Sequence, residues 1–258
     1  MKYIEKHFDT DVVRRYNKEL QEKGLDEDSL TKRKEAGEKL KAGDLYAQIK
    51  RRDIIPPFEE LREQMFEEQG GICCYCGCVL AKQHCSNEHL KPKSRYVELV
   101  GEYKNMLLSC RTSQQEQEEI AREINKQKDT HIKLSKERKK HYHCDEHKQD
   151  DEISVTPLDE DCEQLFIYKS DGTVCGKNEQ AKETLETLNL NCKSLVSQRR
   201  TAIETIIFSD SYPKSKEEYV KELRCISEHI MDKTPKDNLH MEFCFVIKSV
   251  LEDLLQDK

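Results

Sequence analysis

The chain has 258 residues, of which 37% are charged, a net charge of −7 and a mean hydropathy of −0.90. Such a length can bury the core of one large domain or of two small ones. No apolar run approaches the roughly 20 residues that span a bilayer, which excludes an integral helical membrane protein, and the first residues lack the apolar core of a signal peptide. We therefore expect a cytoplasmic protein without a membrane partner.

The amino-terminal region, residues 1–57, is predicted to be helical. Apolar side chains recur at helical spacing before Gly24, which can end a first helix. A second, highly charged helix is expected over residues 29–41. Pro57 closes the region and can occupy the first turn of the next helix.

Residues 58–150 are predicted to hold the core of a functional site. The helix at its start is expected to end at Gly70, and from residues 72–109 the segments between turns are short, which indicates small strands and loops. Residues 113–140 are almost entirely Gln, Glu, Lys and Arg, so they can bury little apolar surface. We interpret the stretch at about 111–142 as a charged insertion between two halves of one site.

Residues 151–258 are predicted to begin with short strands and to continue as helices. Strands are expected over residues 152–155 and 165–168, and the sequence Ser-Asp-Gly-Thr at 170–173 is typical of a hairpin turn. Apolar periodicity then predicts helices over residues 179–190, 193–208, 216–231 and 241–255. We expect these helices to form the main core and to pack with the preceding region as one domain.

Positive charge is concentrated in two stretches. Residues 31–52 hold eight Lys or Arg against three acidic residues, and residues 126–140 hold seven against two. A local basic track on an acidic protein is compatible with nucleic-acid handling. The alternative is a solvated helix face or a flexible loop.

The twelve cysteines need an explanation, because a reducing cytoplasm disfavours structural disulfides. Five of them fall within the 13 residues from Cys73 to Cys85. Cys73-x-x-Cys76 is a knuckle that lets two thiolates meet one tetrahedral ion. Cys110 and Cys144 are the natural second pair, and we predict a structural Zn²⁺ on these four cysteines.

Other side chains near the four cysteines could also bind the ion. A neighbouring thiol could replace one of the four, and an imidazole beside Cys144 could supply a nitrogen ligand. The candidates are Cys74, Cys78, Cys85, His141, His143 and His147.

Glu88-His89 lies between the cysteine pairs. Phosphodiester hydrolysis needs a base near neutral pH and a divalent ion that neutralises charge on the phosphate. A neutral His89 imidazole suits the first task, and Glu88 with Asp145 or His147 could hold Mg²⁺ or Mn²⁺. Adjacent residues of a strand face opposite ways, so Glu88 can contribute only where the backbone is irregular.

Three polar residues after His89 could support this chemistry: Lys91, Lys93 and Asn105. Lys91 and Lys93 suit phosphate contacts that position a nucleic-acid backbone without reading its sequence. Asn105 can bond the backbone of the loop that carries the base and so orient the imidazole. The alternative for Asn105 is an ordinary helix or turn cap.

Together these elements resemble the HNH endonucleases of the PtuB-like family, found in Septu-type and retron-associated anti-phage systems. The likeness covers roughly residues 58–207, and the joint pattern is more specific than its parts. It is carried by the residues from Glu68 to Cys76, Glu88-His89 with Pro92-Lys93-Ser94, the run from Asn105 to Cys110, and His143-Cys144 with Lys148.

The resemblance implies a role for each matched residue. His89 would be the general base, Asn105 the middle residue of the motif, and the four cysteines the zinc cage. Common HNH domains place His or Asn directly after the last cysteine, whereas this chain has Asp145. Aspartate can bind Mg²⁺, and His147 or His143 could serve in its place.

The resemblance also implies partners and a setting. Members act beside a PtuA-like ATPase of the ABC type in the bacterial cytoplasm, and some accompany a retron reverse transcriptase and its msDNA. We therefore expect an α+β, predominantly helical fold with an embedded ββα-metal motif that hydrolyses DNA in anti-phage defence. The alternatives are an RNA- or tRNA-cleaving nuclease of the same system and a catalytically inert, zinc-stapled adaptor, which Asp145 favours.

Overall fold

The computed structural model describes residues 1–112, 117–118, 122, 140–208, 215–236 and 238–256. These residues form an α+β structure in which helices surround small antiparallel sheets. No helix within these ranges combines the length and the apolar character needed to cross a bilayer. The charged insertion predicted at about 111–142 lies almost wholly outside the described residues.

The amino-terminal region is helical, as predicted, but its second helix begins and ends earlier than expected. The bounds are α1 (Asp11–Glu22), α2 (Glu27–Glu35), α3 (Ala42–Ile49) and α4 (Phe58–Glu68). Gly24, with φ +61°, follows α1 as expected. The single helix predicted over residues 29–41 is wrong in extent: Gly37, with φ +82°, lies just after α2, and the chain then starts α3 in a new direction.

The central region is a hairpin. Strands β1 (Ser86–His89) and β2 (Met106–Ser109) pair antiparallel, with Glu88 opposite Leu107 and His89 opposite Met106. The connection contains the 3₁₀ turns η1 (Val97–Leu99) and η2 (Tyr103–Asn105), and the short helix α7 (Asp145–Lys148) follows later in the chain. All of β2 is buried, and α4 packs against it.

The carboxy-terminal region begins with the predicted hairpin. Its bounds are η3 (Cys162–Leu165), β3 (Phe166–Tyr168), β4 (Val174–Gly176), α8 (Glu179–Thr187), α9 (Lys193–Ile207), α10 (Lys216–His229) and α11 (Cys244–Gln256). The strand predicted over residues 152–155 is wrong. There the amide of Val155 donates to Oγ1 of Thr184 at 3.1 Å instead of to a neighbouring strand.

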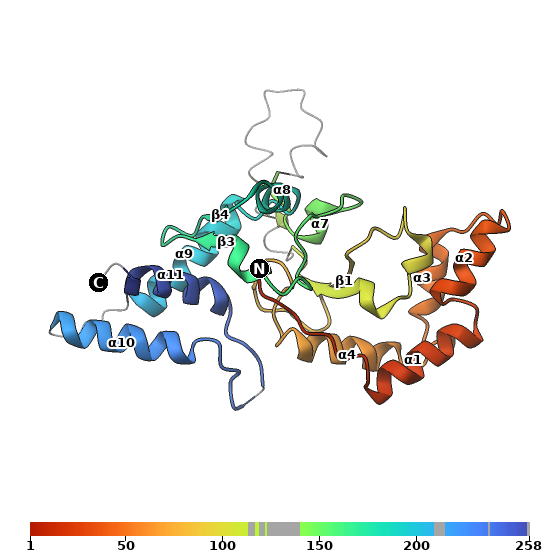
Figure 1. Ribbon diagram of the computed structural model, residues 1–258, viewed down its shortest axis with the longest axis horizontal. Coiled ribbons are helices and arrows are strands. Elements are labelled where there is room, and N and C mark those ends of the chain that lie inside the picture. Colours follow the sequence, from red (N-terminus) through yellow and green to blue (C-terminus); the bar gives the residue numbers. More distant parts are fainter. Residues whose placement is uncertain (113–116, 119–121, 123–139, 209–214, 237, 257–258) are drawn as a thin grey trace, which may run out of the picture.

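The two helical regions lie on opposite sides of the central hairpin (Figure 1). Helices α1, α2 and α3 lie on one side, α9 to α11 lie on the other, and β1, α4 and α7 lie between them. Buried apolar side chains nevertheless form one continuous cluster that draws on all three regions. The middle of the molecule is therefore where residues far apart in sequence meet.

Candidate functional site

The first cysteine pair lies on a tight turn. The amide of Cys73 donates to the carbonyl of Cys78 at 2.8 Å, and the amide of Gly77 donates back to the carbonyl of Cys73 at 3.2 Å. Gly77 has φ +83°, and a Cβ there would lie 2.4 Å from the ring of Phe245. Glycine suits this backbone conformation, and because it has no Cβ it leaves room for Phe245 of α11 to pack against the turn.

The second part of the cluster comes from the end of β2. Cys110 directly follows this strand, and its amide donates to Sγ of Cys73 at 3.3 Å. Gln69, which is buried, joins the two segments: its side chain donates to the carbonyls of Ile72 and Leu108 at 2.9 and 2.8 Å and accepts from the amide of Leu108 at 2.7 Å. The knuckle and β2 are therefore held in fixed register.

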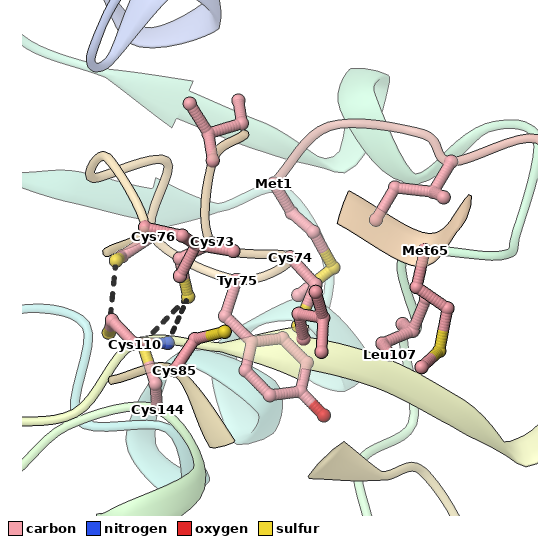
Figure 2. Close-up of a cluster of buried hydrophobic side chains, with 14 of the residues drawn as sticks. Met1, Met65, Cys73, Cys74, Tyr75, Cys76, Cys85, Leu107, Cys110 and Cys144 are labelled. Atoms are coloured by element: carbon pink, nitrogen blue, oxygen red, sulfur yellow. Dashed lines mark hydrogen bonds between the residues drawn. The ribbon is translucent and has the colours of Figure 1, made fainter. Parts of the chain in front are cut away.

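The four predicted cysteines meet in the buried centre of the molecule (Figure 2). Sγ of Cys76 lies 3.7 Å from that of Cys110, and Sγ of Cys73 lies 3.9 Å from that of Cys144. All of the sulfur pairs among the four fall within 4.8 Å. A tetrahedral site with Zn–S bonds of about 2.3 Å has sulfur atoms about 3.8 Å apart, so this donor set fits Zn²⁺.

Two of the alternative ligands also lie at the cluster. Sγ of Cys78 is 3.3 Å from Sγ of Cys76, and Nδ1 of His143 is 3.3 Å from Sγ of Cys144 and 3.7 Å from Sγ of Cys110. Both residues line a cavity of about 970 Å³ that opens beside the cluster. Cys78 and His143 therefore lie on the cavity side of the cluster, whereas Cys73, Cys76 and Cys144 are at most 1% exposed.

Asn105 fastens the loop that follows β1. Its Oδ1 accepts from the amide of Lys91 at 2.7 Å, and its Nδ2 donates to the carbonyls of Lys91 and Leu99 at 3.0 and 3.3 Å. This side chain therefore spans the loop between the two strands. A loop-fixing contact of this kind is what a support role requires.

His89 is held on the face of β1 that meets the amino-terminal helices. Its Nε2 lies 3.0 Å from the carbonyl of Val100, and its ring meets the ring of Tyr46 edge to face at 4.8 Å. A carbonyl can only accept, so Nε2 carries the hydrogen and Nδ1 is the basic atom. Burial lowers the pKa of His89 to about 4, and Lys93 and Lys148 add to this effect, whereas the Val100 carbonyl opposes it.

Glu88 lies on the opposite face of β1. The regular pairing of this strand turns Glu88 and His89 away from each other, so the structure does not bring them to one face. Oε1 of Glu88 accepts from the hydroxyl of Tyr75 at 2.6 Å and from Nζ of Lys148 at 2.8 Å. Burial raises the pKa of Glu88, the carboxylate of Asp145 adds to the rise, and the Lys148 ammonium opposes it.

Lys148 and Asp145 of α7 both reach β1, and Lys148 is the buried one of the two. Its Nζ also donates to the carbonyl of His89 at 3.0 Å, and the side chain is fully buried. Asp145 is half-buried at the start of α7, where its Oδ2 accepts from Oγ of Ser86 at 2.8 Å. His147 turns away, with Nδ1 2.9 Å from the carbonyl of Thr187.

The two lysines predicted to bind phosphate differ in their surroundings. Lys91 is exposed and forms an ion pair with Glu152, which also faces Arg95 at 3.6 Å. Lys93 is half-buried, with Nζ 5.7 Å from the centre of the Tyr46 ring. Lys93 therefore lies nearer to His89, and much of the charge of Lys91 is compensated.

The sequence analysis gave Lys148 no role beyond its part in the resemblance, and it did not connect Tyr46 to this site. A lysine four residues after Cys144 in a polar helix reads as a surface residue, since burial of an ammonium is rare without a partner. Its spacing of one helical turn from Cys144 was the available signal. Nothing local in the sequence connects Tyr46 to His89, 43 residues later.

Comparison with known proteins gives one relative by name. The sequence matches no protein-family model. It is similar to a protein of Vibrio cholerae serotype O1 biovar El Tor that is named as a candidate HNH endonuclease of retron Vc95, with 25% identity over 158 residues. The aligned part is 57% of this chain and 65% of that protein. The chain therefore spans less than two thirds of the relative that it matches.

Proposed function

We propose that the chain is an HNH-type nuclease that hydrolyses phosphodiester bonds. The observation that carries the proposal is the assembly of a four-cysteine cluster with a β-hairpin and a short helix, in which the hairpin carries His89 and the helix directly follows Cys144. The similarity to a protein named as an HNH endonuclease supports the same class.

His89 is the proposed base. Because its pKa is lowered by burial, the imidazole is neutral at physiological pH and Nδ1 can take a proton from water. The bond from Nε2 to the Val100 carbonyl fixes the ring orientation. A bound phosphate would raise the pKa of His89 towards neutrality through its negative charge, which strengthens the base only when substrate is present.

The proposed Zn²⁺ has a structural task. Cys73, Cys76, Cys110 and Cys144 would hold it, and the ion would join the knuckle, the end of β2 and the start of α7. The hairpin then keeps its position against α7 although 33 residues separate the last two cysteines. A structural metal ion of this kind can hold together a site whose residues come from segments far apart in the sequence.

The proposed catalytic Mg²⁺ or Mn²⁺ would neutralise charge on the phosphate. Glu88 as folded does not fit this ion, because its carboxylate already binds the Lys148 ammonium and the Tyr75 hydroxyl. Asp145 is the half-buried carboxylate that remains beside β1, where it accepts a hydrogen bond from Ser86. The proposed proton transfer therefore rests on His89 alone.

The substrate and partners are proposed from the resemblance and from the relative's name. We propose DNA as the substrate in a retron-linked anti-phage system, with a PtuA-like ATPase as partner. Lys93, beside the His89 and Tyr46 rings, is the cation best placed to meet a phosphate. An RNA-cleaving nuclease would use the same residues.

The His89→Ala variant tests the proposal. Purified wild-type protein, with and without the neighbouring ATPase and with Mg²⁺ or Mn²⁺, should cut plasmid DNA or RNA, and His89→Ala should lose at least about 100-fold of that rate. The matched control is His84→Ala, because His84 is an exposed histidine five residues earlier. Equal cleavage by wild type and His89→Ala would refute the role of His89.

A zinc-stapled adaptor is the second candidate, and a specific observation favours it. Glu88, His89 and Lys148 are all at most 4% exposed, and the Tyr46 ring covers His89. An adaptor would bind the ATPase or nucleic acid equally well with and without His89. Binding that survives His89→Ala, together with no cleavage by wild type under any of these conditions, would support this reading.

A further inference from the structure

Arg199 of α9 is a fully buried cation. Its Nε donates to the carbonyl of Gly172 at 2.8 Å, and its Nη2 donates to the carbonyl of Leu190 at 2.6 Å. Its Nη1 has no hydrogen-bond partner. Among the described residues no carboxylate forms an ion pair with the guanidinium, so the usual partner of a buried arginine is missing there.

The turn after α8 connects this side chain to the cysteine cluster: the carbonyl of Leu188 accepts from the amide of Cys144 at 2.8 Å, and two residues later the carbonyl of Leu190 accepts from Nη2 of Arg199 at 2.6 Å. Tyr168 lies beside this arginine: the centre of its ring is 5.9 Å from Cζ of Arg199. Burial lowers the pKa of Arg199, and electrostatic interactions with Tyr168, Cys76, Cys192 and Cys144 oppose this fall.

The cysteine cluster can supply the negative charge that a carboxylate usually provides to a buried arginine. Zinc binds cysteine as thiolate, so one Zn²⁺ with four thiolates carries a net charge of about −2. A buried anion of that size requires compensation from hydrogen bonds or from a cation. The amide of Cys110 and the hydroxyl of Ser109 already point at Sγ of Cys73, but they are neutral.

We infer that Arg199 is the built-in counter-charge of the zinc–thiolate centre, a positioning residue that favours metal binding without touching the metal. The inference rests on the proposed four-cysteine zinc set. It explains why α9, which supplies no cysteine to the cluster, carries a buried cation that binds the turn to which Cys144 is bonded. It also favours four thiolates over a set in which His143 replaces one of them, because that set carries less negative charge.

A purely structural role would give a different result. Arg199 also ties the β-turn at Gly172 to the turn at Leu190, and loss of these bonds alone would loosen the region. Arg199→Gln removes the charge and keeps a polar side chain. Arg199→Lys keeps the charge but cannot reproduce the hydrogen bonds of the guanidinium. Comparison of the two variants therefore separates the effect of the charge from the effect of these hydrogen bonds.

The experiment measures zinc affinity in the full-length chain. Wild type, Arg199→Gln and Arg199→Lys are titrated with a chromophoric chelator, and cobalt-substituted samples are compared by their thiolate-to-metal absorption. Arg200→Gln is the matched control, because Arg200 is the next residue of α9 and is exposed in an ion pair with Glu204. We expect about tenfold weaker zinc binding in Arg199→Gln and near wild-type binding in Arg199→Lys and Arg200→Gln.

The outcomes distinguish the two levels of the proposal. Wild-type protein without bound zinc would overturn the metal centre itself and this inference with it. Equal zinc affinity in wild type and Arg199→Gln, or equal failure of both Arg199 variants in folding or in zinc binding, would overturn only the role of Arg199 as counter-charge. A folded, zinc-loaded Arg199→Lys beside an Arg199→Gln that cannot retain zinc supports it.

Discussion

Nζ of Lys148 lies 2.8 Å from Oε1 of Glu88, and both side chains are almost completely buried. This contact joins α7 to β1 at the point where the catalytic hairpin is proposed. Removing one partner of a buried pair leaves an uncompensated polar group, so we expect Lys148→Met to lower the free energy of unfolding by about 3 kcal/mol. Urea denaturation of the zinc-loaded protein measures this change.

The double variant shows whether the two groups act as a pair. Glu88→Gln with Lys148→Met should recover part of the loss, because neither side chain is then charged. The control is Lys91→Met, since Lys91 forms an exposed ion pair with Glu152 and exposed pairs contribute about 0 to 1 kcal/mol. Strict additivity of the two single changes would contradict a direct interaction.

The second prediction concerns the zinc ligands. Cys73→Ser should reduce bound zinc from about one ion per chain to almost none, because an enclosed ligand is lost, whereas Cys78→Ser and His143→Ala should retain it. Elemental analysis of the purified protein gives the ratio. Cys175→Ser, an exposed cysteine distant from the cluster in sequence, is the control.

The opposite pattern would show that a different ligand set binds the ion. Loss of zinc in Cys78→Ser or His143→Ala with retention in Cys73→Ser would move the centre towards the cavity beside Cys78. Thermal unfolding should follow zinc content in every variant, since metal binding contributes directly to folding.

The third prediction is a pH dependence of stability. The pKa of His89 falls from 6.5 to about 4 in the folded chain because the ring is buried. Between these values the unfolded chain binds more protons at this position, so the free energy of unfolding falls as the pH falls from about 6.5 to about 4. The contribution is fully present above pH 6.5 and amounts to about 3 kcal/mol.

The contribution of His89 is isolated by comparison with His89→Gln. Denaturant unfolding of both proteins from pH 7.5 to pH 4.5, with zinc in excess, should show a steeper acid loss in wild type. Parallel curves would mean that His89 is as easily protonated in the folded chain as in the unfolded one.

The fourth prediction concerns the loop between β1 and β2. Asn105→Ala removes bonds to the amide and the carbonyl of Lys91 and should cost about 2 kcal/mol, because those groups stay partly buried. Limited trypsin digestion should then cut faster after Lys93 and Arg95, because Pro92 blocks cleavage after Lys91. Asn105→Asp, which keeps the acceptor for the Lys91 amide, should show a smaller effect, and resistance equal to wild type in Asn105→Ala would contradict the loop-fixing role.

Much of the local structure was predictable because its causes are local. The knuckle at Cys73 and Cys76 follows from their spacing, and the hairpin after Phe166 follows from its turn residues. The strand expected at residues 152–155 does not form, because the amide of Val155 bonds to the side chain of Thr184 in α8 and not to another strand. Pattern predicts an element only where a partner exists for its backbone.

The sequence by itself determined the chemistry that this protein can hold: cysteines in a metal-binding spacing, a histidine beside a glutamate, and an asparagine before a buried strand. Only the tertiary structure decided which of these groups meet. It brought Cys110 to Cys144 across 33 residues, turned Glu88 and His89 apart, and buried Lys148 and Arg199. The physical reason is that burial and charge compensation depend on what surrounds a side chain in space, which sequence spacing does not specify.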